Sequence, residues 1–128
     1  MKVPYPSIIN GMALHSHMYI CYEQNESKYK YIKCQTLKPY MLTNNPITHY
    51  HDEEPDINRN PFVCITRIDC DKLFSTENVV YNDKLKTTIR PDICEDLFLK
   101  IEKELLSDGF LNIDVNETEL KSINCLIR

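Results

Sequence analysis

The alternation of apolar and polar residues predicts strands over most of the chain and helices near its end. Two β-rich runs, His17–Gln24 and Lys28–Thr36, flank a turn-forming Asn-Glu-Ser segment and predict a hairpin. In the second run four residues alternate with four others, and neither set is purely apolar. The pattern therefore leaves open which face of this strand meets the core.

The segment Phe62–Phe74 begins as an apolar, β-branched strand and ends in a cluster of charge. Residues two apart in a strand share a face, so Arg67, Asp69 and Asp71 are predicted on one side. Ile65, Ile68 and Leu73 are predicted to help fill the interior. A guanidinium beside two carboxylates is suited to proton transfer or phosphate handling, and equally to a surface salt-bridge ladder.

Two segments have no regular pattern. Residues 37–61 contain four prolines and an acidic patch, which indicates a long surface excursion of the kind that often carries function. Residues 75–88 are polar and ambiguous, with a short strand expected around Val79–Tyr81.

Helical spacing appears after residue 90. Apolar residues recur every three or four positions from Pro91 to Ser107, and Gly109 is a suitable stop, so a helix is predicted here. A shorter helix is expected over Thr118–Ile127, with Asn116 and Glu119 in capping-box spacing. Strands followed by a packed helix predict an α+β fold or a small barrel.

Composition narrows the class of protein. A chain of 128 residues is predicted to form one domain, and it has no apolar run long enough to span a membrane. The N-terminus lacks the apolar region of a signal peptide, which predicts a cytoplasmic protein whose six cysteines are reduced and packed as small hydrophobes. A net charge of −4 argues against duplex DNA as a partner. With two glycines and no phosphate-binding loop, no cofactor is expected.

Two further patterns each have a functional and a structural interpretation. The His-x-His pairs His15/His17 and His49/His51 would form a zinc site only if they met in space, and otherwise are solvent-facing or hydrogen-bonded histidines, so no metal is predicted. Tyrosines interleave with lysines along the second predicted strand and just beyond it. This pattern is typical of a surface for single-stranded nucleic acid and also of ordinary sheet packing.

The order of these pieces resembles the Kid/PemK and MazF family of toxin endoribonucleases. Cys70-Asp71-Lys72 stands where that family has Cys-Asp-Gln, followed by Ser75-Thr76 and the predicted helix. Upstream, Met18–Cys21 resembles the family's apolar strand, and Ile32–Thr36 resembles its Pro-Ile-Thr-Ser strand end. The resemblance covers roughly residues 11–106, and Ser16-His17 replaces the family's Arg-Pro.

The resemblance implies a small SH3-like β-barrel with a C-terminal helix. Residues 1–14 would be an extended arm, 15–106 the barrel and helix, and 107–128 a C-terminal extension. The implied activity is metal-independent cleavage of single-stranded RNA by 2′-hydroxyl attack, in a homodimer restrained by an antitoxin protein. Asp71 or Asp69 would be the base, Arg67 the phosphate stabiliser and His17 the acid. Substrate would contact Thr36, Gln35, Lys33, Tyr31 and Lys38.

Two alternatives remain open from the sequence. The acidic surface favours a non-catalytic regulator or inhibitor on the same barrel, which would capture a protein through residues 37–61. A zinc-stabilised domain is a weaker third interpretation, and it predicts loss of structure on chelation.

Overall fold

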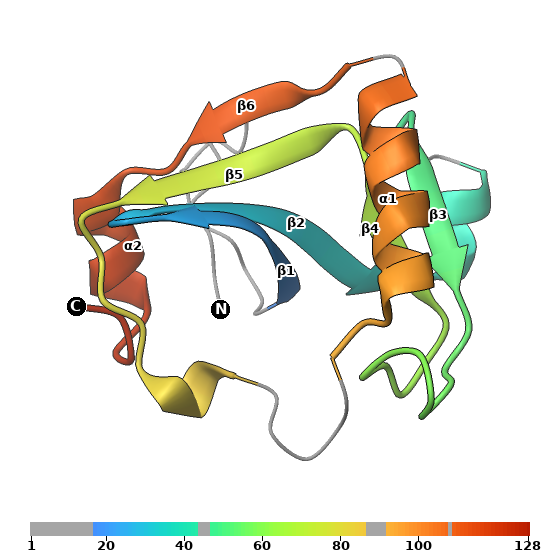
Figure 1. The fold of residues 1–128 in the computed structure, drawn as a ribbon, viewed down its shortest axis with the longest axis horizontal. Coiled ribbons are helices and arrows are strands. Elements are labelled where there is room, and N and C mark those ends of the chain that lie inside the picture. Colours follow the sequence, from blue (N-terminus) through green and yellow to red (C-terminus); the bar gives the residue numbers. More distant parts are fainter. Residues whose placement is uncertain (1–16, 44–46, 87–91, 108) are drawn as a thin grey trace.

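The computed structural model describes residues 17–43, 47–86, 92–107 and 109–128 of the chain. The predicted arm over residues 1–14 lies outside these ranges. The described part is α+β, with six strands in one mixed sheet and two α-helices (Figure 1). The strands are β1 (Met18–Asn25), β2 (Lys28–Thr36), β3 (Tyr50–Glu53), β4 (Thr66–Asp69), β5 (Lys72–Glu77) and β6 (Leu111–Asp114). The helices are α1 (Glu95–Ser107) and α2 (Glu117–Ile123), with short 3-10 turns at Pro39–Leu42 and Asp83–Leu85.

The long strand β2 organises the sheet. One edge of β2 pairs with β1 over nearly its whole length, which confirms the predicted hairpin. The other edge pairs with β5 through its first half and with β4 through its last three residues. Strands β4 and β5 therefore form one arm opposite β2, interrupted at Cys70 and Asp71.

The sheet forks at this interruption. The antiparallel strand β3 pairs with the outer edge of β4, whereas β6 pairs in parallel with β5. On one side of the fork the backbone N–H of Cys70 donates to the carbonyl of His49, and on the other the N–H of Leu111 donates to the carbonyl of Asp71. The sheet does not close on itself, so the predicted barrel is not confirmed.

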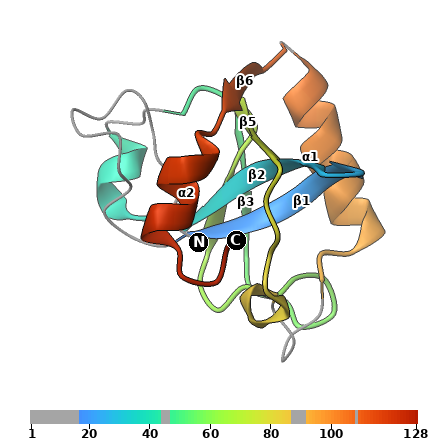
Figure 2. The same ribbon diagram turned by 90° about the vertical axis from the view of Figure 1, so that its left-hand side faces the viewer.

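Both faces of the sheet are covered, by different helices. Helix α1 buries Leu97, Ile101 and Leu105 on the face that carries Ile32 and Ile68 of the sheet. The second core lies on the other face, where α2 packs near the chain terminus (Figure 2). Its buried members are Tyr31, Phe74, Val79, Ile113, Leu120 and Ile127. Since β2 is covered on both sides, its alternation could not identify a single core face.

The C-terminal residues are part of this architecture. The segment predicted as an extension, 107–128, supplies β6 to the sheet and α2 to the second core. The Asn116 side chain accepts a hydrogen bond from the backbone N–H of Glu119 at 3.0 Å, as the capping pattern predicts. Gly109 has a φ of +77°, which suits the residue that ends α1.

Several local predictions are corrected. Ile68 and Leu73 are fully buried, but Ile65 is 43% exposed because β4 begins only at Thr66. Helix α1 begins at Glu95 rather than in the region of Pro91. In place of a strand at 79–81, Tyr81 forms an isolated bridge with Ile127. Cys34 and Cys70 are buried, whereas Cys21, Cys64 and Cys125 are exposed, so the prediction that all six thiols pack inside is wrong.

Neither helix in the described ranges is both long enough and apolar enough to cross a bilayer.

Candidate functional site

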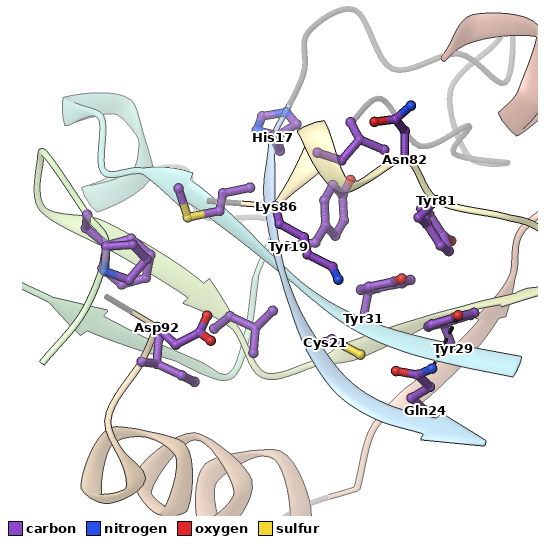
Figure 3. A pocket seen from close by; sticks show the side chains of 16 residues that line it. His17, Tyr19, Cys21, Gln24, Tyr29, Tyr31, Tyr81, Asn82, Lys86 and Asp92 are labelled. Carbon is purple, nitrogen blue, oxygen red and sulfur yellow. Dashed lines mark hydrogen bonds between the residues drawn. The ribbon is translucent and has the colours of Figure 1, made fainter. Parts of the chain in front are cut away.

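The outer edge of β1 borders a groove. In the described part of the chain β1 pairs with no strand except β2, so the backbone groups on its other edge face outward. A pocket of about 710 Å³ lies along this edge, and its other lining residues include Pro61, Phe62, Tyr81, Asn82, Leu85, Lys86, Asp92 and Ile93 (Figure 3). We call this pocket the β1 groove.

Tyrosines dominate one end of the β1 groove. The rings of Tyr29 and Tyr31 lie side by side and nearly parallel, with centroids 6.0 Å apart and planes 5° apart. Tyr81 meets both rings edge-on, at centroid distances of 5.0 Å and 5.6 Å. Tyr19 packs edge-on against Tyr31 at 6.3 Å. These four residues form what we call the tyrosine wall.

The tyrosine wall is electrically neutral. Burial raises the pKa of Tyr19, Tyr31 and Tyr81, with nearby anionic groups and phenols contributing to the shifts. Their hydroxyl groups therefore stay protonated at physiological pH. Burial also raises the pKa of the Cys21 thiol, so this groove cysteine is mainly the neutral thiol at physiological pH.

A second, smaller pocket adjoins the first. Its volume is about 140 Å³, and its lining includes His17, Gln35 and Thr36, three of the predicted site residues. The hairpin register explains the convergence, because Met18 pairs with Cys34 and so places His17 beside the end of β2. The two pockets adjoin each other along β1, because both are lined by His17, Met18 and Phe62. We call the smaller one the His17 pocket.

Arg67 lies outside both pocket linings. Its side chain is 2% exposed and makes a two-point ion pair with Asp52, with both N···O distances 2.8 Å. The remaining terminal nitrogen donates to the carbonyl of Met41 at 3.1 Å, and the guanidinium carbon lies 3.7 Å from the centroid of the Tyr50 ring. All of these contacts are internal, and they fasten β3 and the Pro39–Leu42 turn to β4.

Asp69 and Asp71 are also held by internal contacts. Asp69 shares the face of Arg67, as predicted, and accepts from the Lys72 ammonium at 3.2 Å and from the backbone N–H of Asp71 at 2.8 Å. Asp71 follows β4, so its predicted place on the same strand face is wrong. Its carboxylate accepts from the backbone N–H groups of Thr48 at 2.7 Å and His49 at 2.8 Å.

The remaining predicted substrate contacts are separated. Tyr31 belongs to the tyrosine wall, and Lys38 is exposed beside the Pro39–Leu42 turn, outside both pockets. Lys33 lies half-buried near Asp69. Burial lowers the pKa of Lys33, while Asp69 acts against that shift and the neighbouring Lys72 adds to it.

The histidines of the His-x-His pairs have carboxylate neighbours. His49 lies 3.5 Å from Glu104 of α1, and His51 lies 2.8 Å from Glu53. Among the described residues, which exclude His15, no group of three or more metal-donor side chains is found.

The predicted site residues did not include Tyr19 or Tyr81, two members of the tyrosine wall. Tyr19 was detectable, since it alternates with Cys21 on a predicted strand. Tyr81 had no local signal, because it reaches the wall from an irregular segment fixed by long-range bonds to the C-terminus, such as Val80 N–H to the Arg128 carbonyl at the far end of the chain.

Comparisons with protein-family models, curated proteins and solved structures found no match to this chain.

Proposed function

We propose that this chain is a toxin-like endoribonuclease that binds single-stranded RNA along β1 and cleaves it without a metal ion. The observation that carries the proposal is the gathering of His17, Gln35 and Thr36 around one pocket, directly beside the tyrosine wall. A proton-transfer group, neutral hydrogen-bonding groups and aromatic rings are the components that single-strand cleavage requires.

The proposed chemistry centres on His17. The 2′-hydroxyl of a ribose attacks the adjacent phosphorus, its proton passes to the imidazole, and the same imidazole returns the proton to the departing 5′-oxygen. The products are a 2′,3′-cyclic phosphate and a 5′-hydroxyl. Gln35 and Thr36 would donate hydrogen bonds to the phosphate oxygens as charge develops. Histidine suits this role because its ordinary pKa lies near neutrality.

Arg67, Asp69 and Asp71 have supporting roles in this proposal. Each is already engaged inside the protein, so we assign them to holding β4 and its neighbours in place beside β2, the strand that carries Gln35 and Thr36. The homodimer and the antitoxin partner implied by the family resemblance remain part of the proposal.

The test is incubation of purified protein with labelled single-stranded RNA in EDTA. We expect cleavage by the parent and a loss of at least about 100-fold in His17→Ala, the usual contribution of a proton-transfer group. His49→Ala is the matched control, because this histidine lies 3.5 Å from Glu104 of α1 and lines neither pocket, and it should retain activity within twofold. Intact RNA with a folded parent would refute the nuclease.

A second candidate is a non-catalytic binding module on the same fold. The internal pairing of Arg67, Asp69 and Asp71 favours it, since the charged strand end is then explained by architecture alone. Its signature would be a folded parent that leaves RNA intact at every protein concentration, as expected of a regulator or inhibitor that captures a protein through residues 37–61.

A further inference from the structure

We propose that the tyrosine end of the β1 groove is a recognition subsite for one unpaired nucleobase of the RNA. This inference rests on the proposed function and deepens it, because it names the part of the substrate that this cavity holds. The volume of about 710 Å³ falls within the roughly 300–1,000 Å³ typical of small-molecule sites.

The rings that would contact the base are fixed before it arrives. The Tyr81 hydroxyl lies 2.6 Å from the Thr76 hydroxyl and is also hydrogen-bonded to Tyr31. The Gln24 amide donates to the Tyr29 hydroxyl at 3.3 Å. Preorganised aromatic faces favour stacking, because little conformational freedom is lost on binding.

The outer edge of β1, which borders the groove, can read the edge of a base. The outer edge of β1 presents backbone N–H donors and C=O acceptors in alternation, which is also the character of a nucleobase edge. The amide oxygen of Gln24, whose nitrogen is engaged by Tyr29, adds an acceptor at the rim. A flat ligand with mixed donors and acceptors therefore matches both the tyrosine wall and this edge.

The charge of the lining selects the base rather than the phosphate. Among the lining residues that the structure describes, Lys86 and Asp92 are the two with a formal charge at neutral pH, and their charges are opposite; Lys86 also pairs with Asp83 at 3.1 Å. Phenol hydroxyls are ordinarily neutral at this pH, and burial raises the pKa of Tyr31 and Tyr81 further. The phosphates of the strand would then lie towards the His17 pocket or in solvent, where charge is not penalised.

The first experiment uses the unaltered protein. Cys21 is exposed and lines the groove, whereas Cys125 is exposed and absent from both pocket linings. Alkylation by N-ethylmaleimide is followed by peptide mass spectrometry, with and without each of AMP, GMP, CMP and UMP. We expect at least one nucleotide to slow Cys21 labelling about fivefold or more while Cys125 is unchanged. Ribose 5-phosphate should give no protection. If none of the four nucleotides lowers the rate of Cys21 labelling below the rate measured without nucleotide, the subsite is overturned.

The second experiment separates this inference from the proposed nuclease. Binding of 2′-O-methyl RNA, which cannot be cleaved, is measured for Tyr81→Leu and for the matched control Tyr40→Leu, whose ring is 59% exposed on a distant turn. We expect Tyr81→Leu to weaken binding about tenfold and Tyr40→Leu to change it less than twofold. Gln24→Ala, at an exposed rim position, should shift the preference among bases without affecting folding.

The outcomes are distinguishable. Parent-like RNA binding by a folded Tyr81→Leu overturns the subsite and leaves the nuclease standing. Loss of cleavage in His17→Ala with normal Cys21 protection supports both. Failure of the parent to bind RNA or any nucleotide removes both.

Discussion

Arg67 and Asp52 face each other across β4 and β3 in a two-point ion pair, with Nε–Oδ1 and Nη2–Oδ2 distances of 2.8 Å each. The arginine is 2% exposed and the aspartate 32% exposed, so the pair links the interior to the surface. Two parallel N–H···O bonds impose orientation as well as attraction. This geometry indicates that Arg67 holds the edge strand β3 against β4, so an Arg67 variant is expected to lose stability as well as any activity.

The first prediction concerns this pair. Arg67→Met should lower the free energy of unfolding by about 2–4 kcal/mol, because it leaves Asp52 and the Met41 carbonyl without their donor. Asp52→Asn should cost less, and the double variant should show a coupling energy of about 1–3 kcal/mol. Urea denaturation of the four proteins measures the cycle.

The control for this prediction is Arg59→Met, because the Arg59 side chain is 29% exposed against 2% for Arg67, so its removal should cost less than Arg67→Met. If Arg67→Met instead kept full stability and lost RNA cleavage, Arg67 would act on the substrate, as its strand motif predicts.

The second prediction concerns Asp71. Its carboxylate accepts two backbone N–H groups at the fork of the sheet, so Asp71→Ala should lower stability by about 1–3 kcal/mol. Hydrogen exchange at the Thr48 and His49 amides should accelerate in the variant, whereas amides of Ile32 and Cys34 in the centre of the sheet should change only through the global loss of stability. Loss of activity with unchanged exchange at those two amides would return Asp71 to a catalytic role.

The third prediction is a pH dependence set by Glu53. Burial pushes the pKa of Glu53 upward, but the hydrogen bonds from His51 and Arg59 outweigh it and hold the pKa below the ordinary 4.5. A carboxyl whose pKa is depressed by folding contributes stability that is present above its unfolded pKa and is lost as pH falls through the folded value. Glu53→Gln should therefore be less stable at pH 7 and show a flatter acid limb below about pH 4.5.

Urea midpoints at several pH values between 7 and 3 measure this effect. Glu54→Gln serves as the control, because Glu54 is the exposed neighbour and should leave the acid limb unchanged. The same acid limb in parent and Glu53→Gln would show that the His51–Glu53–Arg59 contacts add no pH-dependent stability.

Local patterns in the sequence predicted the parts of the fold that local forces determine. The hairpin, the apolar stripe of α1 and the Asn116 cap each depend on residues within a few positions of one another. The fork at Cys70 and Asp71 and the parallel pairing of β6 with β5 depend on contacts between distant segments. No periodicity in the sequence encodes such contacts.

The candidate site shows the same division. The charged pattern at Arg67, Asp69 and Asp71 indicated chemistry, but each of these side chains is bonded to a group inside the protein. The sequence does not show whether such a side chain binds an internal partner or a substrate. The family resemblance implied His17 and Thr36 as site residues, and the hairpin register brings them to one pocket. Local pairing thus explains why one set converges and the other does not.

The last prediction tests whether residues 107–128 are an accessory or part of the fold. Leu120 of α2 is fully buried in the second core with Tyr31 and Phe74, so Leu120→Ala should cost about 2–5 kcal/mol. Leu99→Ala on the 52% exposed face of α1 is the matched control and should cost under about 0.5 kcal/mol.

Truncation after Ser107 extends the same test. It would remove β6 from the edge of β5 and uncover the apolar face beneath α2, so we expect loss of cooperative unfolding in urea. The tyrosine wall should lose its fixed arrangement in the truncated chain, because Tyr31 and Tyr81 pack in the second core and Tyr81 bridges to Ile127. A truncated chain that unfolds cooperatively at the parent's urea midpoint would show that the part of the chain up to Ser107 folds without the C-terminal segment.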